Sequence, residues 1–124
     1  MELRVPADSA YVSVLRTTTA GLAARLDFPI DDIEDLRIAV GEASAMVLPE
    51  ADEDGDLCCR FYMQPGRLTV TVGVPCSHGA LRPDYDSFAW QVLTTLATSA
   101  SADTDGGRFT ITLSMESGHL EAGL

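Results

Sequence analysis

Two neighbouring stretches of alternating apolar and polar residues constrain this chain more than any other feature of its sequence. Apolar side chains occupy every second position of residues 57–63 and again of residues 68–72, and Pro65 and Gly66 lie between the two stretches. Successive side chains of a strand point to opposite faces of a sheet, so this alternation indicates two strands that each bury one face. The turn residues between them predict an antiparallel β-hairpin.

Two helices are predicted before this hairpin. Residues 9–26 place apolar side chains on one helical face, and Asp8 or the first residue of that range can cap the helix. Asp31 followed three residues later by Glu34 has the pattern of a capping box, which predicts the start of a second helix. Pro49 stops that helix, because proline lacks the amide hydrogen that a helix interior requires.

The remaining residues complete the set of elements. A short strand at the start of the chain ends at Pro6, and the irregular residues 75–84 are predicted to form a loop. A third helix is predicted over residues 87–99, and alternation predicts a last strand over residues 109–113. The core side of the third helix is expected to consist of Phe88, Val92, Leu93 and Leu96.

The order strand, helix, helix, strand, strand, helix, strand predicts the α+β class. We expect a two-layer sandwich with three helices on one face of a mainly antiparallel sheet. A length of 124 residues suits a single domain. This domain is expected to span residues 1–117, followed by a flexible C-terminal tail over residues 118–124.

The charged residues exclude several classes of function. Nineteen acidic residues against eight basic ones give a formal net charge of −11, which disfavours direct binding to nucleic acid or to an anionic membrane surface. All eight basic residues are arginines, and the absence of lysine excludes a phosphate-binding P-loop and Schiff-base chemistry. The chain has no apolar run near the roughly 18 residues of a membrane span and no apolar leader segment, so a cytoplasmic protein is expected.

The cysteines and histidines do not form a recognisable metal or catalytic motif. Cys58, Cys59 and Cys76 lack the paired spacing of a zinc site. Cys58 and Cys59 are adjacent in a predicted strand, so their side chains should face opposite sides of the sheet. His78 and His119 lie in loop-like segments. We therefore expect buried free thiols and no metal site.

One helix of the chain carries a family resemblance. The run IEDLRIAVGEA, residues 33–43, resembles the helix of RsbW/SpoIIAB-type anti-sigma factors that holds the first motif of their ATP site. The similarity extends back through residues 2–7 and 11–16 and forward through residues 66–72, and it continues more faintly in residues 91–96. The resemblance implies the Bergerat (GHKL) fold of histidine-kinase-like ATPases, here with a shortened lid over the nucleotide site.

The resemblance also implies partners. Proteins of this family bind an alternative sigma factor and hold it off RNA polymerase, and many use ATP to phosphorylate a serine of a STAS-type anti-anti-sigma factor. They form homodimers through the sheet side of the domain. Arg16 matches a family arginine on the first helix that contacts both partners. Its alternative role is that of an ordinary surface arginine, and we favour the partner contact.

The first ATP-site motif is only half retained. In the family it consists of a Glu that acts as general base and, four residues later, an Asn that binds Mg²⁺. Glu42 matches the Glu, whereas Met46 stands at the Asn position. A thioether is a poor ligand for a hard cation. Without the Asn, we favour a solvated helix carboxylate over a catalytic base as the interpretation of Glu42.

The other two motifs are altered at every position that can be compared. The second is an Asp that accepts a hydrogen bond from the adenine amino group, followed by glycines, and Val74 and Cys76 stand at the Asp and at the first Gly. The third is a Gly-rich segment that holds the phosphates at the start of the last helix. Asp86, Ser87 and Ala89 correspond to it. No ATP or Mg²⁺ cofactor is therefore expected, unless a divergent site still binds them.

Three functions follow from the resemblance. The leading one is a homodimeric anti-sigma factor that sequesters an alternative sigma factor and is released by an anti-anti-sigma antagonist without phosphorylating it. The second is an active serine-protein kinase with a divergent ATP site. The third is a scaffold that binds only the antagonist and titrates it from other anti-sigma factors. Trp90 is either a partner anchor or a residue at the edge of the core, and the acidic residues 50–54 are expected to form a solvated turn.

Overall fold

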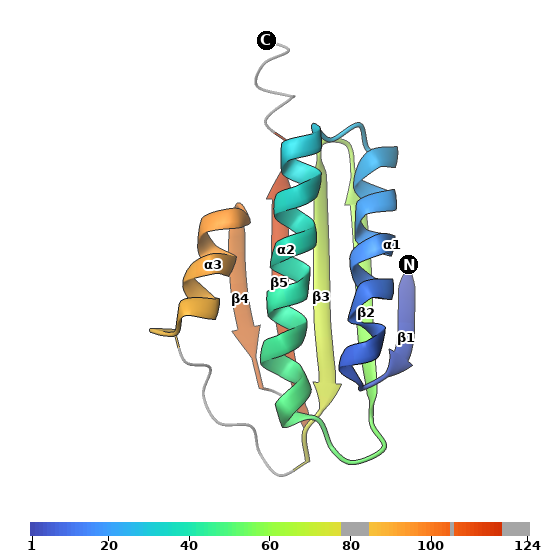
Figure 1. Cartoon of the computed structure of the whole chain (residues 1–124), viewed down its shortest axis with the longest axis vertical. Coiled ribbons are helices and arrows are strands. Elements are labelled where there is room, and N and C mark those ends of the chain that lie inside the picture. Colours follow the sequence, from blue (N-terminus) through green and yellow to red (C-terminus); the bar gives the residue numbers. More distant parts are fainter. Residues whose placement is uncertain (78–84, 105, 118–124) are drawn as a thin grey trace.

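The computed structural model describes residues 1–77, 85–104 and 106–117. Its described part has two layers, in which three α-helices lie on one face of a five-stranded antiparallel sheet (Figure 1). This is the predicted α+β arrangement, and it is consistent with the GHKL-type fold. The strand order is β1-β2-β3-β5-β4. The strands are β1 (Glu2–Pro6), β2 (Asp56–Gln64), β3 (Arg67–Pro75), β4 (Ser99–Asp103) and β5 (Arg108–Glu116), and the α-helices are α1 (Val12–Arg25), α2 (Ile30–Val47) and α3 (Phe88–Leu96).

The predicted hairpin is confirmed as β2 and β3. Its register pairs Phe61 with Val70, and both side chains are buried beneath the helices. Gly66 completes the turn with a φ of 74°, a left-handed conformation that glycine adopts without steric cost. Cys58 and Cys59 lie on opposite faces of β2, since only Cys59 belongs to the core beneath the helices. The thiols of Cys58, Cys59 and Cys76 are all buried, as expected.

The first two helices differ from prediction in how they begin. The chain enters α1 through a 3-10 turn, Ser9–Tyr11, and the amide of Ala10 donates to Oδ1 of Asp8 at 2.9 Å. Asp8 therefore caps this turn, whereas α1 itself follows Tyr11 without a side-chain cap. The capping box at Asp31 is wrong. Helix α2 already begins at Ile30, with Pro29 in the cap position and no side-chain cap. The carbonyl of Pro29 accepts the first helical hydrogen bond, from the amide of Ile33 at 3.0 Å, so Asp31 lies in the first turn, where its negative charge suits the helix dipole.

The third helix is shorter than predicted, and a strand follows it. Helix α3 ends at Leu96, and β4 begins at Ser99, the last residue of the predicted helix, and continues through residues to which no element was assigned. The sequence SASAD has small side chains and weak strand propensity. It becomes a strand because it pairs with β5, where Ala100 lies opposite Leu113 and Ala102 opposite Ile111.

The buried face of α3 is also rotated from the predicted one. Trp90 and Leu93 are its buried residues, and Ala97 continues this side after the helix ends. Leu93 is thus the only fully confirmed member of the predicted core side. Phe88 is 80% exposed. The helix has apolar residues on more than one side, so its sequence alone does not define which side meets α2 and the sheet.

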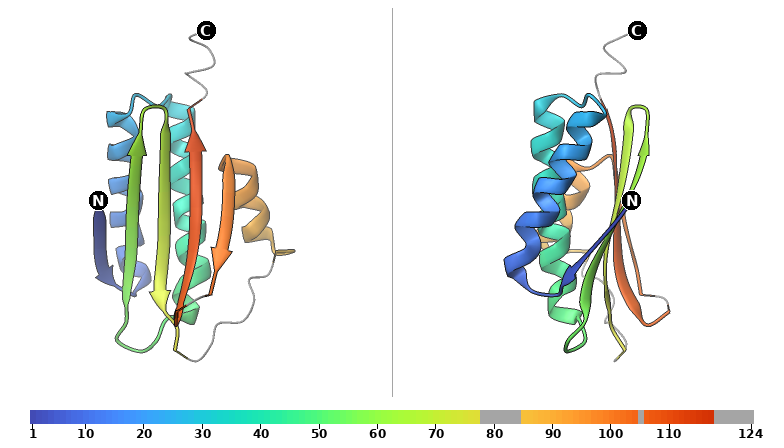
Figure 2. Two further views of the ribbon diagram at one scale, coloured as in Figure 1. Left: turned by 180° about the vertical axis from the view of Figure 1, so that it is seen from behind. Right: turned by 90° about the vertical axis from the view of Figure 1, so that its right-hand side faces the viewer.

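The face of the sheet opposite the helices is open. Figure 2 shows this rear face with none of the described helices across it, and the edge-on view places all three helices on the other side. The exposed face is polar: the hydroxyls of Thr69 and Ser114 are hydrogen-bonded at 2.8 Å, and Arg60 donates to Glu2 at 2.9 Å. Antiparallel sheets tolerate water on one face when that face is polar.

Candidate functional site

The C-terminal half of α2 presents the two residues of the first motif. Glu42 and Met46 are one helical turn apart and both are half-buried. Met46 packs against the hydrophobic core. The end of α2 and the end of β3 lie at the same end of the molecule (Figure 1). The fold therefore brings the first and second motif positions to one region.

The second motif positions at the end of β3 are enclosed by protein. Val74 is fully buried and lies opposite Phe109 of β5. Cys76 is 2% exposed, and its amide donates to the carbonyl of Gly107 at 2.7 Å. Burial raises the pKa of the Cys76 thiol, and the nearby carboxylates of Glu50 and Asp52 raise it further. Val74 thus places buried methyl groups where the family motif has an Asp, and Cys76 places a buried thiol where it has a Gly.

The acidic loop before β2 is anchored to this same region. The carboxylate of Asp52 accepts hydrogen bonds from the amide of Ser77 at 3.0 Å and 3.1 Å, and from the Ser77 hydroxyl at 3.1 Å. The amide of Asp52 donates to the carbonyl of Pro75 at 2.8 Å. The predicted solvated turn holds for Glu53 and Asp54, which are exposed, whereas Asp52 is half-buried and bonded to Ser77. Composition could not indicate this contact, because the two partners are 25 residues apart.

The third motif positions form the start of α3. Ser87 is the N-cap residue, and its hydroxyl oxygen accepts a hydrogen bond from the amide of Trp90 at 3.1 Å. Asp86 is exposed and Ala89 is half-buried. Trp90 is 9% exposed, which supports its interpretation as a residue at the edge of the core. Its ring packs edge-on against that of Tyr85, with 4.9 Å between the two ring centroids. A first-turn amide of this helix is thus already satisfied by the protein.

Arg16 lies on a different surface, on the exposed side of α1. Its side chain lies beside Gly41 of α2. Four other arginines form ion pairs with carboxylates, whereas the described part of the chain contains none for Arg16. Among the residues that the structure describes, its guanidinium therefore has no carboxylate partner, on a chain of formal net charge −11. The four paired arginines are Arg4, Arg37, Arg60 and Arg67.

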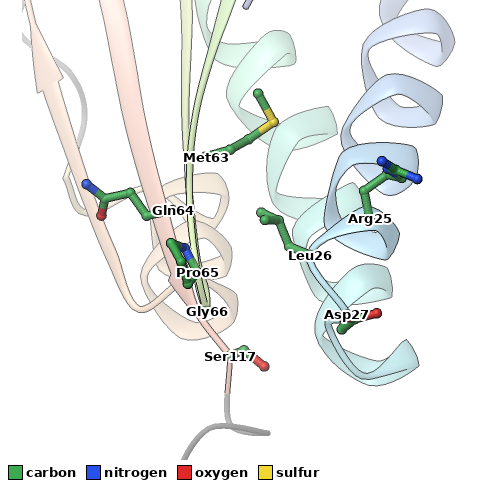
Figure 3. A pocket seen from close by; sticks show the side chains of 8 residues that line it. All are labelled: Arg25, Leu26, Asp27, Met63, Gln64, Pro65, Gly66 and Ser117. Carbon is green, nitrogen blue, oxygen red and sulfur yellow. The ribbon is translucent and has the colours of Figure 1, made fainter.

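A pocket of about 450 Å³ lies away from all of these predicted site residues. It is formed between the turn of the β2–β3 hairpin and the C-terminal end of α1 (Figure 3). Met63 reaches from the strand toward the helices, and Gln64 points to the other side. Arg25 and Asp27 supply charge from the α1 side. No sequence motif marks these residues as a site, and most of them belong to the hairpin and to the end of α1.

Some expectations concern residues that the structure does not describe. His78, His119, most of the predicted loop 75–84 and the predicted tail 118–124 lie outside the described residues. Within the described ranges, no three His, Cys, Asp or Glu residues gather in a way that could hold a metal ion. No helix among these residues has the length and apolar character to cross a bilayer.

Comparison with known proteins identifies relatives named serine-protein kinase RsbW. No family model matches the chain. It is 42% identical over 73 residues to a protein named serine-protein kinase RsbW from Halalkalibacterium halodurans, a match that covers 58% of this chain and 45% of the relative. It is 40% identical over 75 residues to the RsbW protein of Bacillus subtilis, covering 58% and 47%, and 36% identical over 74 residues to that of Bacillus thuringiensis, covering 58% and 46%. The chain thus spans about half the length of the curated relatives it matches, and the resemblance to RsbW-type proteins predicted from its sequence is confirmed.

Proposed function

We propose that this chain is an anti-sigma factor that sequesters an alternative sigma factor and is released by an anti-anti-sigma antagonist. The observation that carries the proposal is its similarity to serine-protein kinases named RsbW over 58% of the chain. Arg16 supports it, because an exposed arginine without an ion pair among the described residues can form a charge-assisted hydrogen bond with a partner's carboxylate. The negative charge of the chain favours a basic partner surface around that contact.

We propose further that this switch works without ATP-dependent phosphorylation. Three features of the motif region support this. Met46 offers a thioether in place of an oxygen ligand for Mg²⁺, fully buried Val74 offers no acceptor for an adenine amino group, and the amide of Trp90 is bonded to Ser87. Each feature removes one interaction that a bound nucleotide would require, so these residues do not fit Mg-ATP.

The retained Glu42 favours a second candidate function. It is half-buried on α2, one turn before Met46, as the general base of a serine-protein kinase would be relative to its metal ligand. A kinase of this kind would phosphorylate a serine of the antagonist. The third candidate, a scaffold that titrates only the antagonist, differs from the first in having no affinity for a sigma factor.

The open face of the sheet is the surface we propose for a homodimer. It is rich in hydroxyl and charged side chains, with Arg60 paired to Glu2 and Arg67 to Glu116. A dimer formed there would be held by polar and ionic contacts more than by apolar burial, so its dissociation constant should rise with salt. Light scattering at micromolar concentration and two ionic strengths tests this, and a monomer at low salt would contradict it.

Three measurements separate the functions. Calorimetric titration with Mg-ATP should show no saturable binding in the micromolar range, and incubation with the antagonist and labelled ATP should leave the antagonist unphosphorylated. Co-expression with candidate sigma factors of the native host should yield a stable complex that the antagonist dissociates. Phosphate transfer would support the kinase, and capture of the antagonist alone would support the scaffold.

A further inference from the structure

Gly41 of α2 is the residue against which the side chain of Arg16 lies. A Cβ atom built on Gly41 would be 3.3 Å from Cδ of Arg16, 3.6 Å from its Nη1 and 4.0 Å from its Cγ. All three are atoms of the Arg16 side chain, from its stem to its guanidinium. The absence of a side chain at position 41 thus leaves the space in which this arginine extends across α2.

The neighbouring Arg16 side chain explains why a glycine stands at position 41 of a helix. Glycine in a helix interior lowers stability relative to alanine, because it loses more backbone freedom on folding. Gly41 lies in the second half of α2 and is half-buried. Gly21 of α1 provides a contrast, since a Cβ built there would meet nothing within 4 Å. Of these two helix glycines, the one in α2 has a neighbour that a side chain would displace, and the one in α1 has none within 4 Å.

We propose that Gly41 is a positioning residue for Arg16 and fixes the direction in which its guanidinium meets a partner's carboxylate. This rests on the proposed function, in which Arg16 contacts the partner. The stem of Arg16 lies against α2, and no carboxylate of the described residues pairs with its guanidinium. A long side chain that is already ordered loses less rotamer freedom on binding. Gly41 therefore increases affinity for the partner through Arg16.

The test compares Gly41→Ala and Gly41→Leu with Gly21→Ala as the matched control. Alanine and leucine are strong helix formers, so the melting temperature of the Gly41 variants should not fall. Displacement of the Arg16 stem should weaken binding to the sigma factor captured by the native protein by about 2- to 10-fold, the cost of ordering one long side chain. The effect should be larger for leucine than for alanine, and Gly21→Ala should bind like the native protein.

Two further measurements decide between this role and others. In the free protein, NMR relaxation of the Arg16 Nε–H group should show greater mobility in Gly41→Leu than in Gly21→Ala. Unchanged mobility and chemical shift of this group would overturn the inference, independently of the binding results.

The second measurement is of binding in an Arg16→Ala background, in which Gly41→Leu should cause no further loss. An equal loss in both backgrounds would overturn it too, since position 41 would then contact the partner itself. If Arg16→Ala alone binds like the native protein, the proposed partner contact of Arg16 is wrong. The relaxation measurement on the free protein still tests whether Gly41 positions the Arg16 side chain.

Discussion

Two regions of α2 carry very different kinds of residues. Near its middle, Gly41 leaves room for the exposed side chain of Arg16, whose charge has no ion-pair partner among the described residues. Farther along, Met46 packs into the core, and nearby positions of the nucleotide motifs are buried, as Val74 and Cys76 are. The first region exposes a charged group, whereas in the second the positions of the motifs belong to the protein's own core. Under the function proposed above, one helix would serve a partner at the first region and pack the core at the second.

The strongest way to break this comparison is to restore a carboxylate in the second region. Val74→Asp places an ionisable group at a position with 0% exposure and no described partner, so we expect it to lower the free energy of unfolding by roughly 3 to 5 kcal/mol. Chemical denaturation measures this loss, and Val74→Thr provides a milder control. A variant that keeps its stability and gains saturable Mg-ATP binding would show that a nucleotide site persists there.

In the first region, Arg16→Ala should affect binding and leave folding intact. We expect the affinity for the sigma factor to fall by about 2 to 4 kcal/mol if the contact is desolvated, with a melting temperature close to that of the native protein, since an exposed arginine contributes little to stability. Arg25→Ala, on the same helix, is the control. Equal binding by both variants would place the partner surface elsewhere, and unfolding of Arg16→Ala would make the residue structural.

A smaller effect is expected at the start of α3. Ser87→Ala removes the hydroxyl that accepts from the amide of Trp90, and the loss of such a cap lowers stability by about 1 kcal/mol. Thermal unfolding measures it, with Ser101→Ala on the exposed face of β4 as control. Freeing this amide should not create ATP binding, because Met46 and Val74 remain. Nucleotide binding by Ser87→Ala would mean that the cap alone had blocked the site.

The smallest effect is a dependence on pH at the open face. A hydrogen bond from Arg60, aided by the charges of Arg60 and Arg4, lowers the pKa of Glu2 from its usual 4.5. A carboxylate whose pKa is lowered by folding stabilises the folded state. Its contribution is complete at a pH above the usual pKa of the group and is lost as the pH falls through the lowered pKa of the folded state. In Glu2→Gln, the melting temperature should therefore fall slightly less than in the native protein as the pH is lowered from about 5 to about 3. Glu53→Gln, an exposed loop carboxylate, should leave the profile unchanged, and identical profiles for both variants would contradict the assignment.

Local chemistry was sufficient to predict several elements from the sequence. The alternation of residues 57–63 and 68–72 with Gly66 between them determined the hairpin, and Asp8 caps the 3-10 turn that leads into the first helix. The motif comparison located Glu42 and Met46 on one helix, one turn apart. These features depend on residues within a few positions of one another, and their periodicity and capping chemistry are visible in one dimension.

The tertiary structure decided what depends on distant partners. The residues of β4 form a strand only because β5 lies beside them, and α3 turns Trp90 inward and Phe88 outward because α2 and the sheet cover one of its sides. Asp52 became an anchor through Ser77. Likewise, the contact of Arg16 with Gly41 arises where two helices pack side by side. Each of these interactions joins groups that chain folding brings together, so no local pattern of the sequence records it.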